Sequence, residues 1–162
     1  MTSFAPIDDS ADLIRHIESC YHARHRKRFA ELVKLAEMIE DLHDGDEGRP
    51  EGLTDILRRM TGTLEAHMKR AELTLFPAIR KGGMPGIGQQ IAVMRADHDG
   101  FGRDIAQIRE ITAGFTLPDT ACTSWETLYA GVAAFVGDLA EHMRLEDEVL
   151  FARFEPAGVA HV

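Results

Sequence analysis

The sequence has few cysteines, no long apolar run and no excess of positive charge. Cys20 and Cys122 are the only cysteines in 162 residues, too few for the disulfide framework of a small secreted domain. No apolar run approaches the roughly 20 residues of a membrane-spanning helix. A formal net charge of −9 disfavours nucleic acids and anionic membranes as partners, because both attract positive surfaces. These absences predict a cytoplasmic protein with a single domain over residues 1–162.

Strand-like alternation is also missing, and helix formers dominate between three loops rich in glycine, proline and aspartate. The loops cover residues 43–52, 81–88 and 114–122. The segments between them predict helices over residues 9–43, 52–80, 87–113 and 123–154. Long helices with short connections predict an all-α, antiparallel up-down-up-down four-helix bundle.

The beginning of the last helix carries two local signals. Thr123 followed by Glu126 predicts a capping box, in which each side chain bonds a free backbone N–H of the other residue. Cys122 directly precedes this helix end, where the helix dipole lowers the pKa of a thiol. A plain loop cysteine is the alternative interpretation of Cys122.

Each of the last three predicted helices has an apolar seam, a row of apolar positions that repeats in steps of four and three residues. His67, His98 and His142 fall within these seams, and so does Glu146. Because such seams face the core of a bundle, all four side chains are predicted to be buried. A buried carboxylate without a partner is costly, so Glu146 needs a strong partner inside the bundle.

The three seam histidines are predicted to lie at one level of the bundle. His67 and His98 are almost equally far from the loop between their helices, so their depths differ by about 1.5 Å. The depth of His142 differs by about 6 Å, which the nine-residue loop over 114–122 can absorb. The first helix offers His22 and His25; its periodicity favours His25 and leaves His22 open.

A cluster of buried histidines calls for a different explanation from a single one. One histidine on an apolar face is usually a core residue bonded to a backbone carbonyl. Three at one level beside a buried acid favour a metal site, and imidazole with carboxylate suits iron, manganese or zinc. The lack of paired cysteines disfavours thiolate ligands. The sequence shows no Ser/His/Asp or Cys/His catalytic arrangement, so enzyme activity stays undecided.

Five segments carry a resemblance to a known family. They are "YHARHRKRFAEL", "EAHMKRAELTLFPAI", "MRADHDGFG", "ACTSWETLYAG" and "EHMRLEDEVLF". Over about residues 10–155 the sequence resembles the hemerythrin-like (HHE) di-iron proteins, most closely the iron-sulfur cluster repair (RIC-type) branch. The resemblance implies two irons inside the bundle and binding of O2 or NO. It also implies a role in nitrosative or oxidative stress, with an iron-sulfur protein as the partner.

The resemblance also implies a set of metal ligands. They are His22, His67, His98, His142 and Glu146. His25 is then a reserve or supporting residue. His43 matches a family histidine near the site, with an ordinary helix-end histidine as the alternative.

The sequence departs from the family pattern at one bridging position. Family members bridge the irons with two glutamates, each four residues after a histidine, but Ala71 occupies one of these places. Glu72 is predicted to point to the solvated side of its helix. Glu18, four residues before His22, is predicted to lie at the right level and to supply the missing carboxylate; an ordinary, partly exposed glutamate is the alternative. The resemblance starts near residue 10, so we expect no cysteine-bearing N-terminal domain.

Three other functions fit the same residues. One is an iron or gas sensor in which ligand binding alters the bundle. Another is a peroxidase- or catalase-like di-iron enzyme. The third is a structural bundle that holds one zinc ion.

Overall fold

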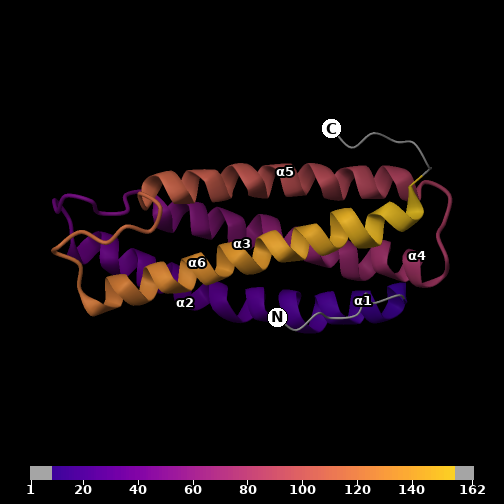
Figure 1. The fold of residues 1–162 in the computed structure, drawn as a ribbon, viewed down its shortest axis with the longest axis horizontal. Helices are drawn as coiled ribbons and strands as arrows, with labels where there is room; N and C mark the ends of the chain where they lie inside the picture. Colours follow the sequence, from indigo (N-terminus) through magenta and orange to yellow (C-terminus); the bar gives the residue numbers. More distant parts are fainter. Residues whose placement is uncertain (1–8, 156–162) are drawn as a thin grey trace.

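The computed structural model describes residues 9–155, which form four helical arms connected by three loops (Figure 1). The first arm contains α1 Ser10–His16, η1 Ile17–His22 and α2 Ala23–Leu42. The second contains α3 Leu53–Arg70, η2 Ala71–Leu75 and α4 Phe76–Arg80. The third is α5 Ile87–Ile111, and the fourth contains α6 Thr123–Arg144, η3 Leu145–Leu150 and η4 Phe151–Phe154. The predicted all-α bundle is confirmed: no strand occurs between residues 9 and 155.

Three of the arms contain a π-helical segment, in which each backbone N–H bonds the carbonyl five residues earlier. These segments are η1, which carries His22, η2, which begins four residues after His67, and η3, which carries Glu146. The periodicity of the sequence predicted regular α-helix there. Short π-helical segments often occur at functional sites because they redirect the side chains around them.

The buried interior consists of two apolar clusters. The larger lies toward the loops that connect α2 to α3 and α5 to α6, and includes Leu64, Phe101 and Leu139. The smaller lies toward the loop between α4 and α5, and includes Ala71 and Leu150. Along each arm, the buried histidines and Glu146 lie near the boundary between the two clusters, although Met68 of the larger cluster follows His67. We call this set the polar layer; it consists of His22, His25, His67, His98, His142 and Glu146.

The predicted capping box of the last helix is wrong. Cys122 is the N-cap of α6, Thr123 is already helical, and no side chain caps the helix end. The first turn therefore directs its free backbone N–H groups toward Cys122.

The beginning of α3 is capped by a residue of another arm. Gly52 is the N-cap of α3 at φ 90°, and it has no side chain that could accept a hydrogen bond. The carboxylate of Glu40, in α2, accepts hydrogen bonds from the N–H groups of Gly52 at 2.7 Å and Thr54 at 3.0 Å. It also accepts one from the Thr54 hydroxyl. Glu40 thus ties the second arm to the first.

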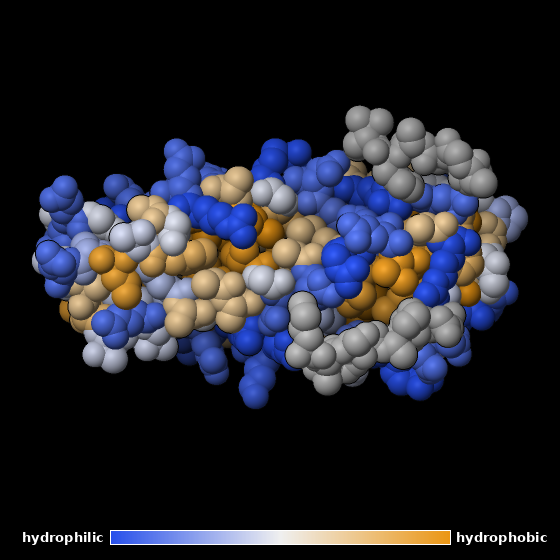
Figure 2. All heavy atoms as spheres, viewed as in Figure 1, coloured by the Kyte–Doolittle hydropathy of each residue, from blue (hydrophilic) through white to orange (hydrophobic). Residues whose placement is uncertain are grey.

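The helices are amphipathic, with polar side chains on their outer faces. Figure 2 shows one face, on which hydrophilic residues surround apolar residues that are visible along its middle. No helix within residues 9–155 is both long and apolar enough to span a membrane.

Candidate metal centre

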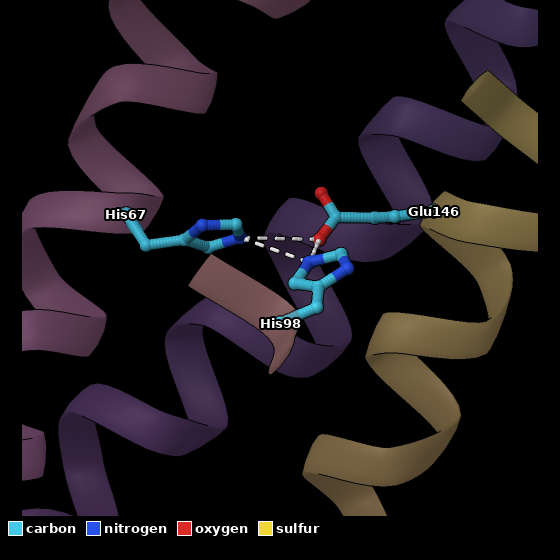
Figure 3. Close-up of side chains that lie close together, drawn as sticks. All are labelled: His67, His98 and Glu146. Atoms are coloured by element: carbon cyan, nitrogen blue, oxygen red, sulfur yellow. Dashed lines mark hydrogen bonds and ion pairs between the residues drawn. The ribbon is translucent and has the colours of Figure 1, made fainter. Parts of the chain in front are cut away.

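Three buried side chains from three arms converge inside the bundle (Figure 3). Oε1 of Glu146 lies 3.3 Å from Nε2 of His67 and 3.1 Å from Nε2 of His98. The two imidazole nitrogens are 3.3 Å apart. The potential ligand atoms of the three residues all lie within 4.8 Å of one another, so they can reach a single metal ion.

A second pair of histidines lies beside the same carboxylate. Nε2 of His142 is 2.9 Å from Oε1 of Glu146, and the ring centroid of His22 is 4.9 Å from that of His142. The rings of His67 and His98 are also 4.9 Å apart. The buried carboxylate of Glu146 thus contacts both His67 and His98, and it also contacts His142 of the second pair.

Carboxylates outside this cluster hold three of the histidines by the opposite ring nitrogen. Nδ1 of His67 lies 2.8 Å from Asp97, Nδ1 of His98 lies 2.8 Å from Asp147, and Nδ1 of His22 lies 3.1 Å from Glu72. An ionised carboxylate only accepts hydrogen bonds, so each Nδ1 carries the proton and donates it. In the neutral ring this leaves the Nε2 lone pair facing the cluster, as a metal ligand requires.

His142 is oriented by a histidine instead. Its Nδ1 is hydrogen-bonded to Nε2 of His25 at 3.1 Å, and the two rings stack with their centroids 5.3 Å apart. His25 is fully buried, as its position in the apolar seam predicted. His25 therefore contacts His142 at the ring nitrogen opposite the one that faces Glu146.

The electrostatics divide the histidines into two groups. Burial and the neighbouring His142 lower the pKa of His22 to about 4, and they lower the pKa of His25 to about 3. Burial also acts to lower the pKa of His98, but hydrogen bonds to Asp147 and Glu146 outweigh it and raise that pKa to about 9. The pKa of His67 is raised for the same reason by Asp97 and Glu146.

Glu146 is the charged centre of the polar layer. Burial alone would raise its pKa, but the surrounding histidines hold the pKa well below its ordinary value. Its second oxygen, Oε2, is buried without a hydrogen-bond partner. Nε2 of His22 is likewise buried without a hydrogen-bond partner, and Nε2 of His142 has only its 2.9 Å contact with Oε1 of Glu146, which lacks hydrogen-bond geometry. Buried polar atoms in native proteins normally have partners, so these unused donor atoms fit a bound cation.

The structure places Glu18 away from these atoms. Its carboxylate lies 3.5 Å from Nη2 of Arg80, and 32% of its side chain is exposed. Ala71 is fully buried next to the polar layer, as expected for the position of the missing glutamate. That Glu18 binds metal stays a prediction. It requires the side chain of Glu18 to move away from Arg80.

The prediction that Glu72 points into solvent is wrong. Only 23% of its side chain is exposed, and its carboxylate contacts both His22 and Arg26. The prediction assumed a regular α-helix, whereas Glu72 lies in the π-helical segment η2, where the side chains are turned relative to that pattern.

His43 does not lie near the polar layer. It follows the C-terminal end of α2, where its ring packs against Trp125 with centroids 4.6 Å apart. His43 comes eighteen positions after His25, which corresponds to about 27 Å along the helix at 1.5 Å per residue.

Sequence reasoning did not assign Asp97 and Asp147 to particular histidines. Each adjoins a cluster residue in the sequence, which was the only signal available. Asp97 precedes His98 but bonds His67, and Asp147 follows Glu146 but bonds His98. Only the arrangement of the arms in space reveals these pairs.

Comparisons with known proteins agree with this geometry. The family model described as "Hemerythrin HHE cation binding domain" matches residues 14–154. The chain therefore belongs to the hemerythrin HHE family, whose domain binds metal cations.

The chain is also similar to curated bacterial proteins. It is 42% identical over 142 residues to the iron-sulfur cluster repair protein YtfE of Dickeya chrysanthemi (88% of this chain, 64% of the relative). It is 38% identical over 143 residues to the YtfE protein of Pectobacterium carotovorum subsp. carotovorum (88% and 65%). A probable iron-sulfur cluster repair protein of Haemophilus influenzae is 37% identical over 143 residues (88% and 64%). The chain thus spans slightly less than two thirds of the length of these relatives.

Proposed function

We propose that the polar layer binds two iron ions, with His22, His67, His98, His142 and Glu146 as ligands. One observation carries this proposal: two pairs of histidines lie around a single buried carboxylate, with 4.9 Å between the rings of each pair. Glu146 is suited to bridge two ions because both of its oxygens are buried and one is unused. Zinc or manganese is compatible with the same donors.

The residues around the cluster prepare it for metal. Asp97, Asp147 and Glu72 fix the proton on Nδ1 and thereby turn Nε2 toward the interior. The two apolar clusters keep water away from both sides of the polar layer. Bound iron would supply open coordination positions and redox chemistry for a small gaseous ligand such as O2 or NO.

Repair of iron-sulfur clusters under nitrosative or oxidative stress is the role that we propose for this centre. The curated relatives named above are described as repair proteins, and the chain shares 37–42% identity with them over the bundle. An iron-sulfur protein would then be the partner. The proposed compartment is the cytoplasm, where Cys20 and Cys122, both free in the structure, would stay reduced.

Metal analysis tests the di-iron proposal directly. Protein purified without added metal and then reconstituted with ferrous iron should contain about two irons per chain. Glu146→Gln should lose both, because the bridge then lacks its charge. One zinc per chain, or none of these metals, would contradict the proposal.

A single-metal site is a second candidate, favoured by the tight group of His67, His98 and Glu146. The variants His22→Asn and His142→Asn separate the two possibilities. Two irons require both residues, so each variant should reduce the iron content to about one per chain. A single metal at the other three residues would stay bound in both variants.

Repair activity needs a separate measurement. An iron-sulfur enzyme inactivated by NO or peroxide should regain activity with the iron-loaded chain, but not with the Glu146→Gln variant. The recovery is measured with the chain alone and again with cell extract added. No recovery even with cell extract added would contradict the repair role and leave the metal centre standing.

A further inference from the structure

A second cluster of reactive side chains lies at the end of the bundle formed by the loops over 43–52 and 114–122 (Figure 1). Nε2 of His43 lies 3.3 Å from Sγ of Cys122, and Nδ1 of His43 lies 2.7 Å from Oδ2 of Asp46. A thiol, an imidazole and a carboxylate thus form one chain of hydrogen bonds. This arrangement could not be predicted from the sequence, because Cys122 is far from the other two residues along the chain.

Cys122 occupies a position that favours its thiolate form. It is the N-cap of α6, next to the backbone N–H groups of Ser124 and Trp125 in the first turn. The hydrogen bond with His43 and, next, those N–H groups lower the pKa of the thiol. Cys122 is half-buried at the edge of the larger apolar cluster.

His43 is held firmly between its two partners. Its side chain is only 13% exposed, and its ring lies against Trp125. The hydrogen bonds with Cys122 and Asp46 raise the pKa of His43 above its ordinary value. Since Asp46 can accept only from Nδ1–H, Nε2 of His43 is the atom that exchanges a proton with the sulfur.

Contact between the two loops keeps the cluster assembled. A Cβ placed on Gly48 would lie 3.3 Å from Cγ of Pro118, so the loop with Asp46 packs closely on the loop before Cys122. Other charged residues of these elements are Asp44, Glu47, Arg49 and Glu51 in the first loop, Asp119 in the second, and Glu126 in the first turn of α6. Asp46, 41% exposed, is the acid that touches His43.

We propose that Cys122 is a nucleophilic thiol that undergoes disulfide exchange with disulfides of low-molecular-weight thiols, and that His43 and Asp46 position and protonate the reacting groups. The Cys122 sulfur forms a bond to one sulfur of the small disulfide, whose own S–S bond breaks. The departing thiolate takes a proton from Nε2 of His43. In the reverse reaction His43 accepts a proton from an incoming thiol, which displaces Cys122.

The choice of a small external disulfide follows from the fold. Cys20, the other cysteine, lies in η1, and the whole length of α2 separates it from His43. The two thiols are therefore about 30 Å apart and cannot form a disulfide within the chain. The proposed site is also separate from the polar layer, so it does not depend on the proposed metal function.

The test compares the two cysteines within the same protein. Full-length chain with Cys20→Ser retains only Cys122, and chain with Cys122→Ser retains only Cys20. With oxidised glutathione at pH 7, followed by mass spectrometry, Cys122 should form the mixed disulfide at least about tenfold faster than Cys20. Equal rates would overturn the proposal.

The pH profile tests the role of His43. In the Cys20→Ser protein, the rate should reach half its maximum clearly below pH 8.5, the ordinary pKa of a thiol. His43→Gln should slow the reaction about tenfold at pH 7 and have little effect above about pH 9.5, where the thiol ionises unaided. A midpoint at or above pH 8.5, or equal slowing at every pH, would overturn the proposal.

His16 provides a matched control. Its Nδ1 lies 3.5 Å from Sγ of Cys20, so His16→Gln removes a histidine next to the other cysteine. This variant should leave the rate and pH profile of Cys122 unchanged. Equal helical circular dichroism and iron content across the variants would show that the fold and the metal centre are intact.

Discussion

At the scale of single residues, several carboxylates serve the proposed centre without reaching it. Asp97, Asp147 and Glu72 each hold one histidine by its outer nitrogen, whereas Glu146 alone lies among the inner nitrogens. The distinction matters for mutagenesis, because loss of an outer carboxylate should weaken metal binding without removing a ligand.

Glu72 offers the cleanest test of this distinction. Glu72→Gln should lower iron affinity by about 10- to 100-fold, because His22 loses the acceptor that fixes its proton and orientation. Titration of the metal-free variant with ferrous iron measures this. Glu65 is the matched control: it also binds Arg26, at 3.0 Å, but is not bonded to His22. Glu65→Gln should keep the original affinity; an equal loss in both variants would point to Arg26 instead.

Glu18 calls for a paired experiment with Arg80. If Glu18 supplies the second carboxylate, Glu18→Ala should lower iron affinity by about 10-fold or more. Arg80→Ala, which frees the carboxylate, should leave iron binding intact or strengthen it. Iron titration of both variants decides the matter. Two irons bound with unchanged affinity in Glu18→Ala would leave Glu18 only its contact with Arg80.

The burial of the histidines and Glu146 could be predicted from the sequence, because the apolar seams include them. The partners of these residues could not, since hydrogen bonds such as His67 to Asp97 join side chains on different arms. The same limit applies to Cys122 and His43, because periodicity within one helix cannot predict a contact between residues of different arms.

At the scale of helices, one arm stabilises the beginning of the next. Gly52 leaves α3 without a cap of its own, and Glu40 supplies the acceptor from α2. The sequence does not reveal such a cap, because the known capping patterns join residues three positions apart.

We predict that Glu40→Ala lowers the free energy of unfolding by about 1–2 kcal/mol, the usual cost of a lost N-cap. Chemical denaturation measures the change. Glu37 is a suitable control, since it also connects α2 to α3, through Arg58, but both side chains are about half exposed. Glu37→Ala should cost less than about 1 kcal/mol. Equal losses would argue against a capping role for Glu40.

The π-helical segments are the part of the helices that sequence periodicity missed. The step of 100° per residue describes a regular helix and places Glu72 on the outside. The wider turns of η2 bring it to His22 instead. Local geometry of this kind depends on packing among the arms. The positions of the loops, and so the residues at which the arms begin and end, depend on glycine and proline and could be predicted from the sequence.

At the scale of the whole molecule, the metal-free protein should be most stable near pH 6.5. His98, with its pKa raised to about 9, contributes stability that is complete below the unfolded value of 6.5 and is lost as pH rises through 9. The pKa values of His22 and His25 are lowered to about 4 and 3, so their contribution to stability is complete above the unfolded value of 6.5. The folded protein disfavours the protonated form of both rings, whereas the unfolded chain accepts the proton. Stability is therefore lost as pH falls from 6.5 toward 4.

Urea denaturation of chelator-treated protein across pH 4–9.5 should show this maximum. Each proton involved changes the free energy of unfolding by about 1.4 kcal/mol per pH unit. His98→Gln should flatten the alkaline side, and His25→Gln should flatten the acidic side. With iron bound, the alkaline decline should shrink, because metal replaces the proton between His98 and Glu146. A flat profile in the metal-free protein would contradict these assignments.

The arrangement of the interior has a consequence for how the chain opens. A layer of imidazoles and one carboxylate interrupts the apolar contacts, so without metal the two halves of the bundle are joined mainly by continuous helix backbone. Such halves can behave as separate cooperative units that lose protection against amide hydrogen exchange independently. The half that contains Ala71 and Leu150 has the smaller core and should exchange first. A metal ion bound across the layer would then join the two halves into a single cooperative unit.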